Sequence, residues 1–414
     1  MTNKRTKDPL EQQYTNHPYP QPIMNMQEQI EKFGYKQMSS FDLIWKKLFP
    51  EKDYDDDIDV LIAGCGTNQA IYHALKFPKS KNYAIDISQT SIDHVKNMIK
   101  KYDLKNLEVE KKDIVDLNAK QKFDYIISTG VIHHTKDPQE SLNKLVKITK
   151  SDGALFIMIY ASFLRHGIYY LQDVFRYLKI QPDQKGVSLI KNLLRLLPEN
   201  HYALNYIKGM QISSGTRDFE FDAGIVDTFL NARDKSYDIY ELKEMIENSG
   251  SYFQCWLNND CYYRDLIDFS KEEELKNNFE NLDPWERADF TQKFDPNNGK
   301  FSFILRKEKK FENIWFDIKS LNKETYANHN EYKAKKSMDI DSNYGGSIGI
   351  GDVSIDLTVE ERVIWDNLNN KVKNILVHSN REFKKNNLQE ITLNELFVLL
   401  HKFWKRGRLD FSYV

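Results

Sequence analysis

Short apolar runs alternate with amphipathic stretches between residues 58 and 160. The runs predict buried strands, and apolar residues spaced three and four apart in the stretches between them predict helices. Strands joined by crossover helices pair in parallel, so the pattern predicts an α/β fold with a doubly wound, mostly parallel sheet. The seven expected strands are Ile58–Ala63, Asn82–Ile87, Leu107–Lys112, Phe123–Ser128, Ala154–Ile159, Tyr252–Leu257 and Phe301–Leu305.

Helix start signals stand between these strands. Ser88 can cap a helix after the second strand, and Asp137-Pro138-Gln139-Glu140 combines a cap, a proline at the first helical position and a capping-box glutamate. Asp238 and Glu241 form a further capping box ahead of the sixth strand. These signals support the alternation of strands and helices.

The chain is longer than one hydrophobic core usually organises, so we expect more than one unit. Residues 1–50 are expected to form an N-terminal segment and lid, and residues 51–307 the sheet domain, with a helical insertion at 163–235. Residues 308–345 are polar and irregular, which is typical of a linker. Residues 346–414 are then expected to form a small C-terminal module.

Two capping boxes open helices in that module, Thr358 with Glu361 and Thr392 with Glu395. A short apolar segment follows the second helix. Helices followed by a short strand predict a mainly helical unit that could be winged-helix-like.

Composition narrows the class of protein. Lys and Arg number 59 against 61 Asp and Glu, so no charge excess attracts nucleic acid or acidic lipid. Three cysteines without a CxxC pair favour a reducing compartment. We find neither a signal peptide nor an apolar run long enough to cross a membrane. We therefore expect a cytoplasmic protein that has no membrane partner and does not act on nucleic acid.

The strongest chemical signal is the turn Ala63-Gly64-Cys65-Gly66-Thr67 after the first strand. Glycines let the backbone turn sharply and let a ligand approach without a Cβ in the way. Asp86 closes the second strand 22 residues after Gly64, where a carboxylate can accept both hydroxyls of a ribose. Asp113 follows the third strand, where an adenine amino group would lie if the ligand is adenosyl.

These motifs resemble the class I S-adenosylmethionine-dependent methyltransferases, which have a seven-stranded Rossmann-like sheet. The resemblance also rests on Ile85–Ser88, Lys112–Ile114 and Phe123–His134. It implies that the cofactor is S-adenosyl-L-methionine, with the glycine turn at its methionine part, Asp86 at its ribose and Asp113 at its adenine. The cofactor-binding residues expected from the resemblance are Ala63, Gly64, Cys65, Gly66, Asp86, Ile87, Asp113, Ile114, Thr129 and Gly130. Where many members carry a third glycine, this chain has Asn68.

Two other functions compete with a methyltransferase. A nicotinamide-dependent oxidoreductase would carry Gly-x-Gly-x-x-Gly, but the third glycine is replaced by Gln69. A non-catalytic protein that kept the fold and binds S-adenosylmethionine or a partner is the stronger alternative. The methyl acceptor is not identified by the sequence, although a small molecule or a protein is favoured.

The candidate catalytic residues are His133 and Tyr19. The resemblance places His133 just after the fourth strand, beside the cofactor, where it could be a general base or line the pocket. Tyr19 lies in His17-Pro18-Tyr19-Pro20, which is similar to a stretch in bacterial methyltransferase domains fused to tetratricopeptide repeats. It could belong to a lid or to a rigid surface turn. His133 and His134 are adjacent and have no third ligand at motif spacing, so we expect no metal. The C-terminal module is a candidate for contact with a protein partner.

Overall fold

The computed structural model describes residues 8–33, 38–213, 219, 221–259, 262, 272–295, 298–309, 321–329 and 357–413. Cys261, one of the three cysteines, lies outside this part of the chain. Among the helices described, none has the length and apolar character needed to cross a membrane.

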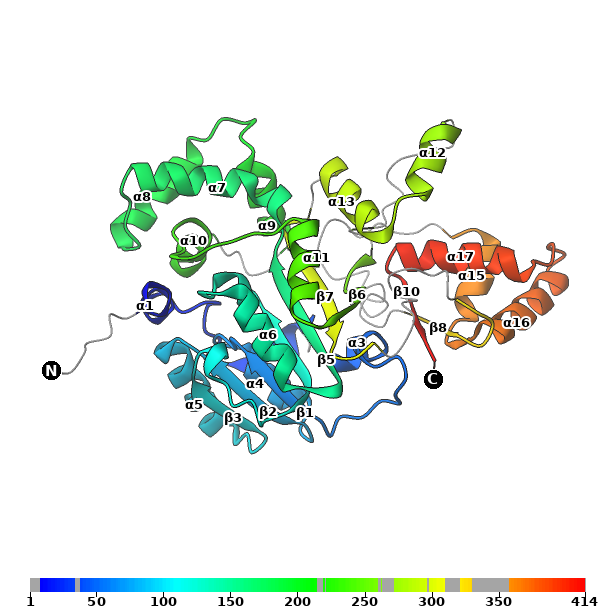
Figure 1. Ribbon diagram of the computed structural model, residues 1–414, viewed down its shortest axis with the longest axis horizontal. Helices are drawn as coiled ribbons and strands as arrows, with labels where there is room; N and C mark the ends of the chain where they lie inside the picture. Colours follow the sequence, from blue (N-terminus) through cyan, green and yellow to red (C-terminus); the bar gives the residue numbers. More distant parts are fainter. Residues whose placement is uncertain are drawn as a thin grey trace.

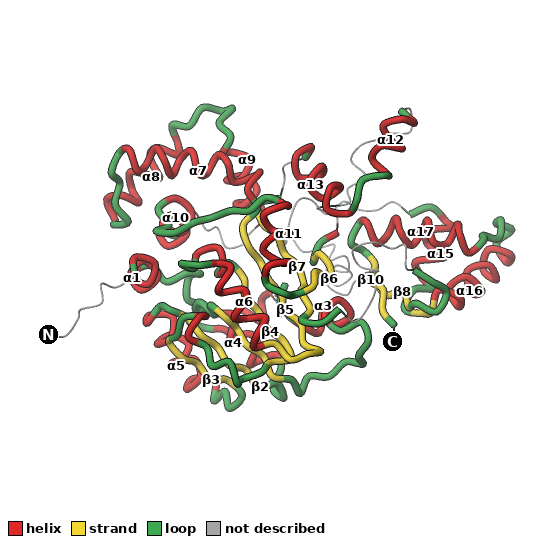
Figure 2. The backbone as a smooth tube through the Cα atoms, viewed as in Figure 1, coloured by secondary structure: helices red, strands yellow, loops and turns green. Residues whose placement is uncertain are grey.

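The expected α/β fold is confirmed. A seven-stranded sheet has the order β3-β2-β1-β4-β5-β7-β6, in which β1 to β5 pair in parallel and β7 runs antiparallel to both neighbours. Figure 2 shows the strands in yellow among the helices, which are red. The strands are β1 (Asp59–Ala63), β2 (Lys81–Asp86), β3 (Leu107–Lys111), β4 (Phe123–Thr129), β5 (Thr149–Tyr160), β6 (Tyr252–Trp256) and β7 (Lys300–Arg306). β5 begins earlier than expected because Thr149 still pairs with Phe123 beyond an irregular register.

Helices cover the sheet as its alternating sequence predicts. Ser88, Asp137 and Asp238 each cap the helix expected to follow, and Asp238 forms its capping box with Glu241. The helices of the domain are α1 (Pro9–Asn16), α2 (Met26–Phe33), α3 (Phe41–Leu48), α4 (Gln69–Lys76), α5 (Gln89–Tyr102), α6 (Pro138–Ile148), α11 (Ile239–Asn248), α12 (Glu273–Glu280) and α13 (Pro284–Phe294).

Four helices follow β5 and form a separate lobe, in the region where the sequence predicts a helical insertion. They pack around their own apolar cluster, which includes Leu171, Phe175 and Phe229. The lobe and the C-terminal module lie at opposite ends of the molecule, with the sheet between them (Figure 1). Its helices are α7 (Ser162–Tyr177), α8 (Gln184–Arg195), α9 (Ala203–Ser213) and α10 (Asp222–Phe229).

As far as the structure describes it, the C-terminal module combines three helices with a small antiparallel sheet of order β10-β8-β9. Both capping boxes expected there are present. The central strand, β8, comes from residues that the sequence predicts as linker. These residues form a strand because the backbone of Tyr326–His329 pairs with β9 and β10. The elements are β8 (Tyr326–His329), α15 (Val359–Asp366), β9 (Asn370–Lys371), α16 (Val372–Lys385), α17 (Leu393–Lys405) and β10 (Leu409–Ser412).

The module shares one continuous apolar core with the main sheet. β10 packs against α3, where Asp410 forms a buried ion pair with Lys47. The backbone N–H of Tyr413 donates to the carbonyl of Pro50, and the side chain of Asn259 donates to the carbonyl of Trp404. The module is therefore built into the body of the protein.

Candidate functional site

The glycine turn after β1 is shaped by two glycines in the left-handed backbone region. Gly64 has a φ of 78° and Gly66 a φ of 53°. A Cβ on Gly64 would lie 2.3 Å from Cγ2 of Val131, so the loop after β4 excludes any side chain there. The N–H groups of Gly64 and Cys65 both donate to the carbonyl of Ile85 at 2.9 Å. The turn is thus held against the ends of β2 and β4.

Asp86 joins this turn to the end of β2. Its Oδ2 accepts a hydrogen bond from the N–H of Gly66 at 2.9 Å, and its Oδ1 accepts one from the N–H of Ser88 at 2.8 Å. Burial raises the pKa of the Asp86 carboxyl, although these bonds act in the opposite direction. The side chain is still partly exposed, as is the neighbouring Ile87. Each carboxylate oxygen has a second lone pair for a ligand hydroxyl.

The next strand ends in a similar way. Asp113 caps a single turn, η1 (Ile114–Asp116), and its Oδ1 accepts a hydrogen bond from the N–H of Val115 at 3.3 Å. The Asp113 side chain is partly exposed, whereas Ile114 is buried. One carboxylate oxygen is used by the cap, so the other can face a ligand.

Thr129 ends β4, and Gly130 follows it, beside the glycine turn. The Thr129 hydroxyl donates to Oε1 of Gln69, and Gly130 has a φ of 75°. The chain order reverses between β1 and β4, which is the switch point where open α/β sheets bind ligands at the carboxyl ends of their strands. All the predicted cofactor residues therefore lie at the carboxyl ends of four neighbouring strands, β3-β2-β1-β4, and these strand ends together form what we call the cofactor edge.

Cys65 lies within this edge but is buried in the turn. Burial raises the pKa of its thiol well above the ordinary value, and the Asp86 carboxylate adds to the effect. The thiol is therefore protonated at neutral pH and packs in the turn, since only the thiolate is a strong nucleophile.

The segment around Tyr19 lies directly on the glycine turn. A Cβ on Gly66 would come within 3.0 Å of the Tyr19 carbonyl oxygen and 3.1 Å of Cδ of Pro20. The Thr67 hydroxyl donates to the Pro20 carbonyl at 2.7 Å. The sequence predicts that this segment is either a lid over the active site or a rigid surface turn, but it does not identify the glycine turn as the segment's contact.

Asn68 clasps the same segment from the position where related turns often have glycine. Its side-chain amide donates to the Gln21 carbonyl at 3.0 Å, and its Oδ1 accepts from the N–H of Ile23 at 3.0 Å. The side chain thus pairs with backbone groups on both sides of Pro22. This pairing gives the departure from glycine a physical reason.

We expect Asn68→Ala to release this clasp. The variant loses two hydrogen bonds worth about 1 kcal/mol each, so local opening of the segment should become roughly tenfold or more frequent. Hydrogen exchange of a peptide spanning residues 17–25 measures this directly, because the Ile23 amide is one of the donors. Gln89→Ala, which changes an exposed amide side chain at the start of α5, is the control. Equal exchange in both variants would contradict a clasping role.

Helix α1 extends the N-terminal contact across the site. The Tyr14 carbonyl accepts from the Ser88 hydroxyl at 2.9 Å, which ties α1 to α5. On its other side, the Tyr14 hydroxyl donates to Asp227 at 2.8 Å, and Asp8 pairs with Arg233. The N-terminal segment therefore links the cofactor edge to the lobe formed by the insertion.

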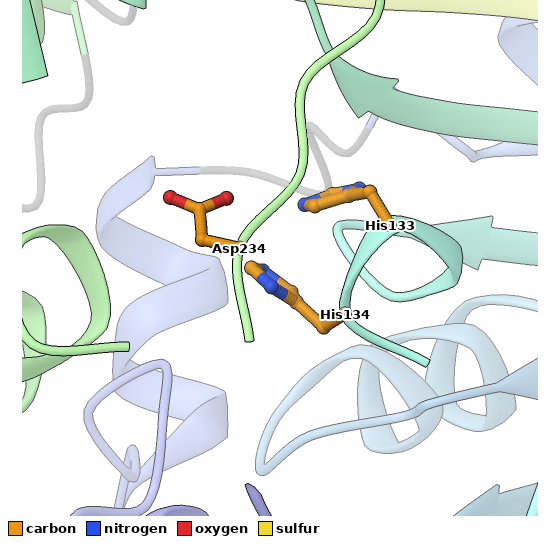
Figure 3. A group of neighbouring side chains, drawn as sticks. All are labelled: His133, His134 and Asp234. Carbon is orange, nitrogen blue, oxygen red and sulfur yellow. The ribbon is translucent and has the colours of Figure 1, made fainter. Parts of the chain in front are cut away.

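Beside the cofactor edge lies a cluster of buried polar side chains (Figure 3). His133 and His134 stand on η2 (Ile132–His134), the turn after β4, and Asp234 comes from the loop after α10. Their ligand atoms all lie within 4.8 Å of one another. Asp234 follows His134 by 100 residues, so no local spacing in the sequence points to it. The spacing argument against a third ligand does not hold in the folded chain.

His133 is buried against Tyr160, with ring centroids 4.0 Å apart. Burial holds the pKa of His133 well below its usual range, and the neighbouring His134 and Arg165 act in the same direction. The ring is therefore neutral. An imidazole whose pKa lies well below its usual range is a weak general base at neutral pH, so the burial of His133 disfavours proton abstraction by this ring.

A buried ion pair fixes Asp234. Arg165 Nη2 donates to Asp234 Oδ2 at 2.9 Å, and both side chains are about 1% exposed. The side-chain amide of Gln172 donates to the same oxygen at 3.0 Å. The guanidinium of Arg165 also lies 3.6 Å from the centroid of the Tyr160 ring. The orientation of the carboxylate is thus set by two helix residues and an aromatic ring.

Comparison with known proteins agrees with this geometry. Residues 54–196 match a family described as a methyltransferase domain. An uncharacterized protein of Synechococcus sp. is 25% identical over 264 residues, which are 62% of each chain. A malonyl-[acyl-carrier protein] O-methyltransferase of Acetivibrio thermocellus is 26% identical over 175 residues, which are 41% of this chain and 60% of that protein. The chain thus spans less than two thirds of the length of these relatives.

A solved structure resembles nearly the whole chain. PKMT2 from Rickettsia typhi has a TM-score of 0.61 and 17% sequence identity, and the match covers 92% of this chain and 76% of that one. The same protein in complex with AdoHcy gives a TM-score of 0.59. At this identity the likeness establishes the fold, and it extends into the C-terminal region.

Proposed function

We propose that this protein, whose residues 54–196 match a methyltransferase domain, is a class I S-adenosylmethionine-dependent methyltransferase that transfers a methyl group to a small molecule or a protein. S-adenosyl-L-methionine is the cofactor of such domains, and it supplies an electrophilic methyl group on a sulfonium sulfur. The residues of the chain bind this cofactor and position the acceptor.

The observation that carries the proposal is the position of Asp86. One partly exposed carboxylate closes β2, holds the N–H of Gly66 and keeps lone pairs for a vicinal diol. We propose that Asp86 accepts the ribose hydroxyls and that Asp113, on the adjacent strand, accepts the adenine amino group. The donors that an adenosyl group offers fit these two acceptors.

We further propose that the N-terminal segment and η2 form the two sides between which the acceptor reaches the methyl group. The Tyr19 segment would cover the glycine turn, and His133 would line the opposite side as a neutral ring. Catalysis would then rest on holding donor and acceptor in line away from water. A base is needed only for acceptors that must lose a proton first.

The C-terminal module is proposed to serve contact with a protein partner. Its basic and acidic residues nearly balance, so it lacks the electrostatic footprint of a nucleic-acid-binding unit. Because its core is continuous with that of the sheet, a partner bound there would be held at a fixed distance from the cofactor edge.

We expect the purified protein to convert S-adenosylmethionine to S-adenosylhomocysteine when it is supplied with a cognate lysate. Lysate fractions of small molecules, protein and RNA should be assayed separately, and mass spectrometry should identify the species that gains one methyl group. Asp86→Ala is the matched control and should lose turnover. Tight binding of S-adenosylhomocysteine without turnover in any fraction would instead indicate a non-catalytic binding protein.

A further inference from the structure

The cluster of His133, His134 and Asp234 has unused lone pairs in a buried place. Neither ring nitrogen of His133 has a hydrogen-bond partner among the residues that the structure describes, and the same holds for Oδ1 of Asp234. His133 is 1% exposed, and the Asp234 side chain is equally buried. Buried polar atoms without partners cost free energy, so such a set indicates a ligand that the atoms are arranged to meet.

The surroundings orient each lone pair. His134 Nδ1 lies 2.6 Å from the Arg233 carbonyl, so Nδ1 carries the hydrogen and Nε2 keeps its lone pair. Asp234 Oδ2 is held by Arg165 and Gln172, which leaves Oδ1 as the open oxygen. In metal sites, a ligating histidine typically donates its other N–H to a carbonyl, and a ligating carboxylate accepts a hydrogen bond from a neighbouring donor. His134 and Asp234 have contacts of these two kinds.

We propose that His133, His134 and Asp234 bind a divalent transition-metal ion, with Zn²⁺ as the best-matched one. Two imidazoles and one carboxylate suit zinc or iron, whereas magnesium and calcium prefer oxygen ligands throughout. Three protein ligands leave a coordination position open, as in catalytic zinc sites.

The distances and charges bear on this assignment. Ligand atoms in a tetrahedral zinc site lie about 3.4 Å apart, and the atoms here lie within 4.8 Å of one another, so binding of an ion requires them to move closer together. No hydrogen bond of His133 or of Asp234 Oδ1 has to be broken first. Two carboxylates, Asp234 and Asp227, lie near the guanidinium of Arg165, while the guanidinium of Arg233 donates to the His134 carbonyl and pairs with Asp8.

The proposed metal site lies close to the cofactor edge, which suggests a role in catalysis. His133 is two residues from Val131, which contacts the glycine turn at Gly64. An ion with an open position there would lie next to the cofactor edge, where it could polarise an oxygen atom of a bound molecule. Metal binding itself is independent of the proposed methyl transfer, so the two can fail separately.

The test uses the full-length protein, stripped with a chelator and dialysed. Titration with ZnCl₂ followed by elemental analysis should find one bound zinc per chain. His133→Ala and Asp234→Asn should weaken binding about 100-fold or more, because the first removes a ligand and the second replaces an anionic carboxylate with a neutral amide. His94→Ala, which removes a half-buried histidine on α5, is the matched control and should bind zinc as the unmodified protein does.

Cobalt provides a second readout that needs no variant. Co²⁺ bound by two histidines and a carboxylate should give visible ligand-field absorption, and added Zn²⁺ should abolish it. Circular dichroism checks that each variant folds. If Asp234→Asn does not fold without its pairing to Arg165, the proposed metal site can still be tested with His133→Ala and with the cobalt spectrum. Absence of stoichiometric zinc in the unmodified protein, or equal affinity in His133→Ala, would overturn the proposal.

Discussion

Asp410→Ala is expected to lower the free energy of unfolding by about 3–5 kcal/mol, since it leaves the buried ammonium of Lys47 without its carboxylate. Lys47 on α3 and Asp410 on β10 form an ion pair whose side chains are 1% and 5% exposed. Water cannot solvate the remaining charge there, and no surface pair would give so large an effect. Denaturant unfolding of the full-length protein, followed by circular dichroism, measures the change.

The control is Asp366→Ala in the same module. Asp366 pairs with Arg362 one helical turn away, and both side chains are more than half exposed, so the change should stay within about 0.5 kcal/mol. A double variant, Lys47→Met with Asp410→Leu, should recover most of the loss because it removes both charges together. If Asp410→Ala were no more damaging than Asp366→Ala, the pair would not hold the module in place.

The same pair bears on the domain organisation expected from the sequence. A linker after residue 307 predicts that a chain ending near Lys310 still folds and binds cofactor. Such a truncation would remove Asp410 and expose the apolar core that β10 shares with α3. We therefore expect the truncated chain to be strongly destabilised.

The parts of the fold that local chemistry decides are the parts that the sequence predicts well. A capping box such as Thr358 with Glu361 needs only residues three apart, and both boxes of the module form as expected. Most strands of the sheet lie close to the predicted ranges because they are buried apolar runs with polar ends, whereas β3 alternates apolar and charged residues and is only partly buried. The cofactor edge follows from the same pattern, since parallel strands end at one side of the sheet.

Contacts between distant segments could not be predicted in this way. β8 has no strong strand signal and is a strand because β9 and β10 pair with it. Asp234 is an ordinary loop aspartate in the sequence, and only the folded chain brings it to His133 and His134. From the sequence alone, Asn68 is only a replacement of the third glycine, whereas the structure shows that its side chain bonds to the N-terminal segment. In each case the meaning of the residue depends on a partner that no local spacing identifies.

Asp86→Ala is expected to weaken binding of S-adenosylhomocysteine by about 2–4 kcal/mol, or roughly 30- to 1,000-fold. The variant loses two hydrogen bonds from ribose hydroxyls to a charged acceptor. It also frees the N–H of Gly66, whose bond to Asp86 helps shape the turn. Asp86→Asn keeps one acceptor oxygen and should show a smaller loss. Calorimetric titration gives both affinities, and Asp93→Ala, an exposed aspartate on α5, should bind as the unmodified protein does.

The pH dependence of this affinity shows how much of it depends on the negative charge of Asp86 and how much on the shape of its side chain. Burial raises the pKa of Asp86, so its carboxylate takes up a proton at a higher pH than an ordinary aspartate does. Ribose hydroxyls donate to the ionised form, so affinity should be full above the raised pKa and should fall as the pH is lowered through it. Bound ligand should in turn lower the pKa, because it favours the ionised form. Asparagine cannot titrate, so Asp86→Asn should lose this dependence while the remaining contacts still bind. If the unmodified protein and Asp86→Asn showed the same affinity and the same pH profile, the ribose would have to lie elsewhere along the cofactor edge.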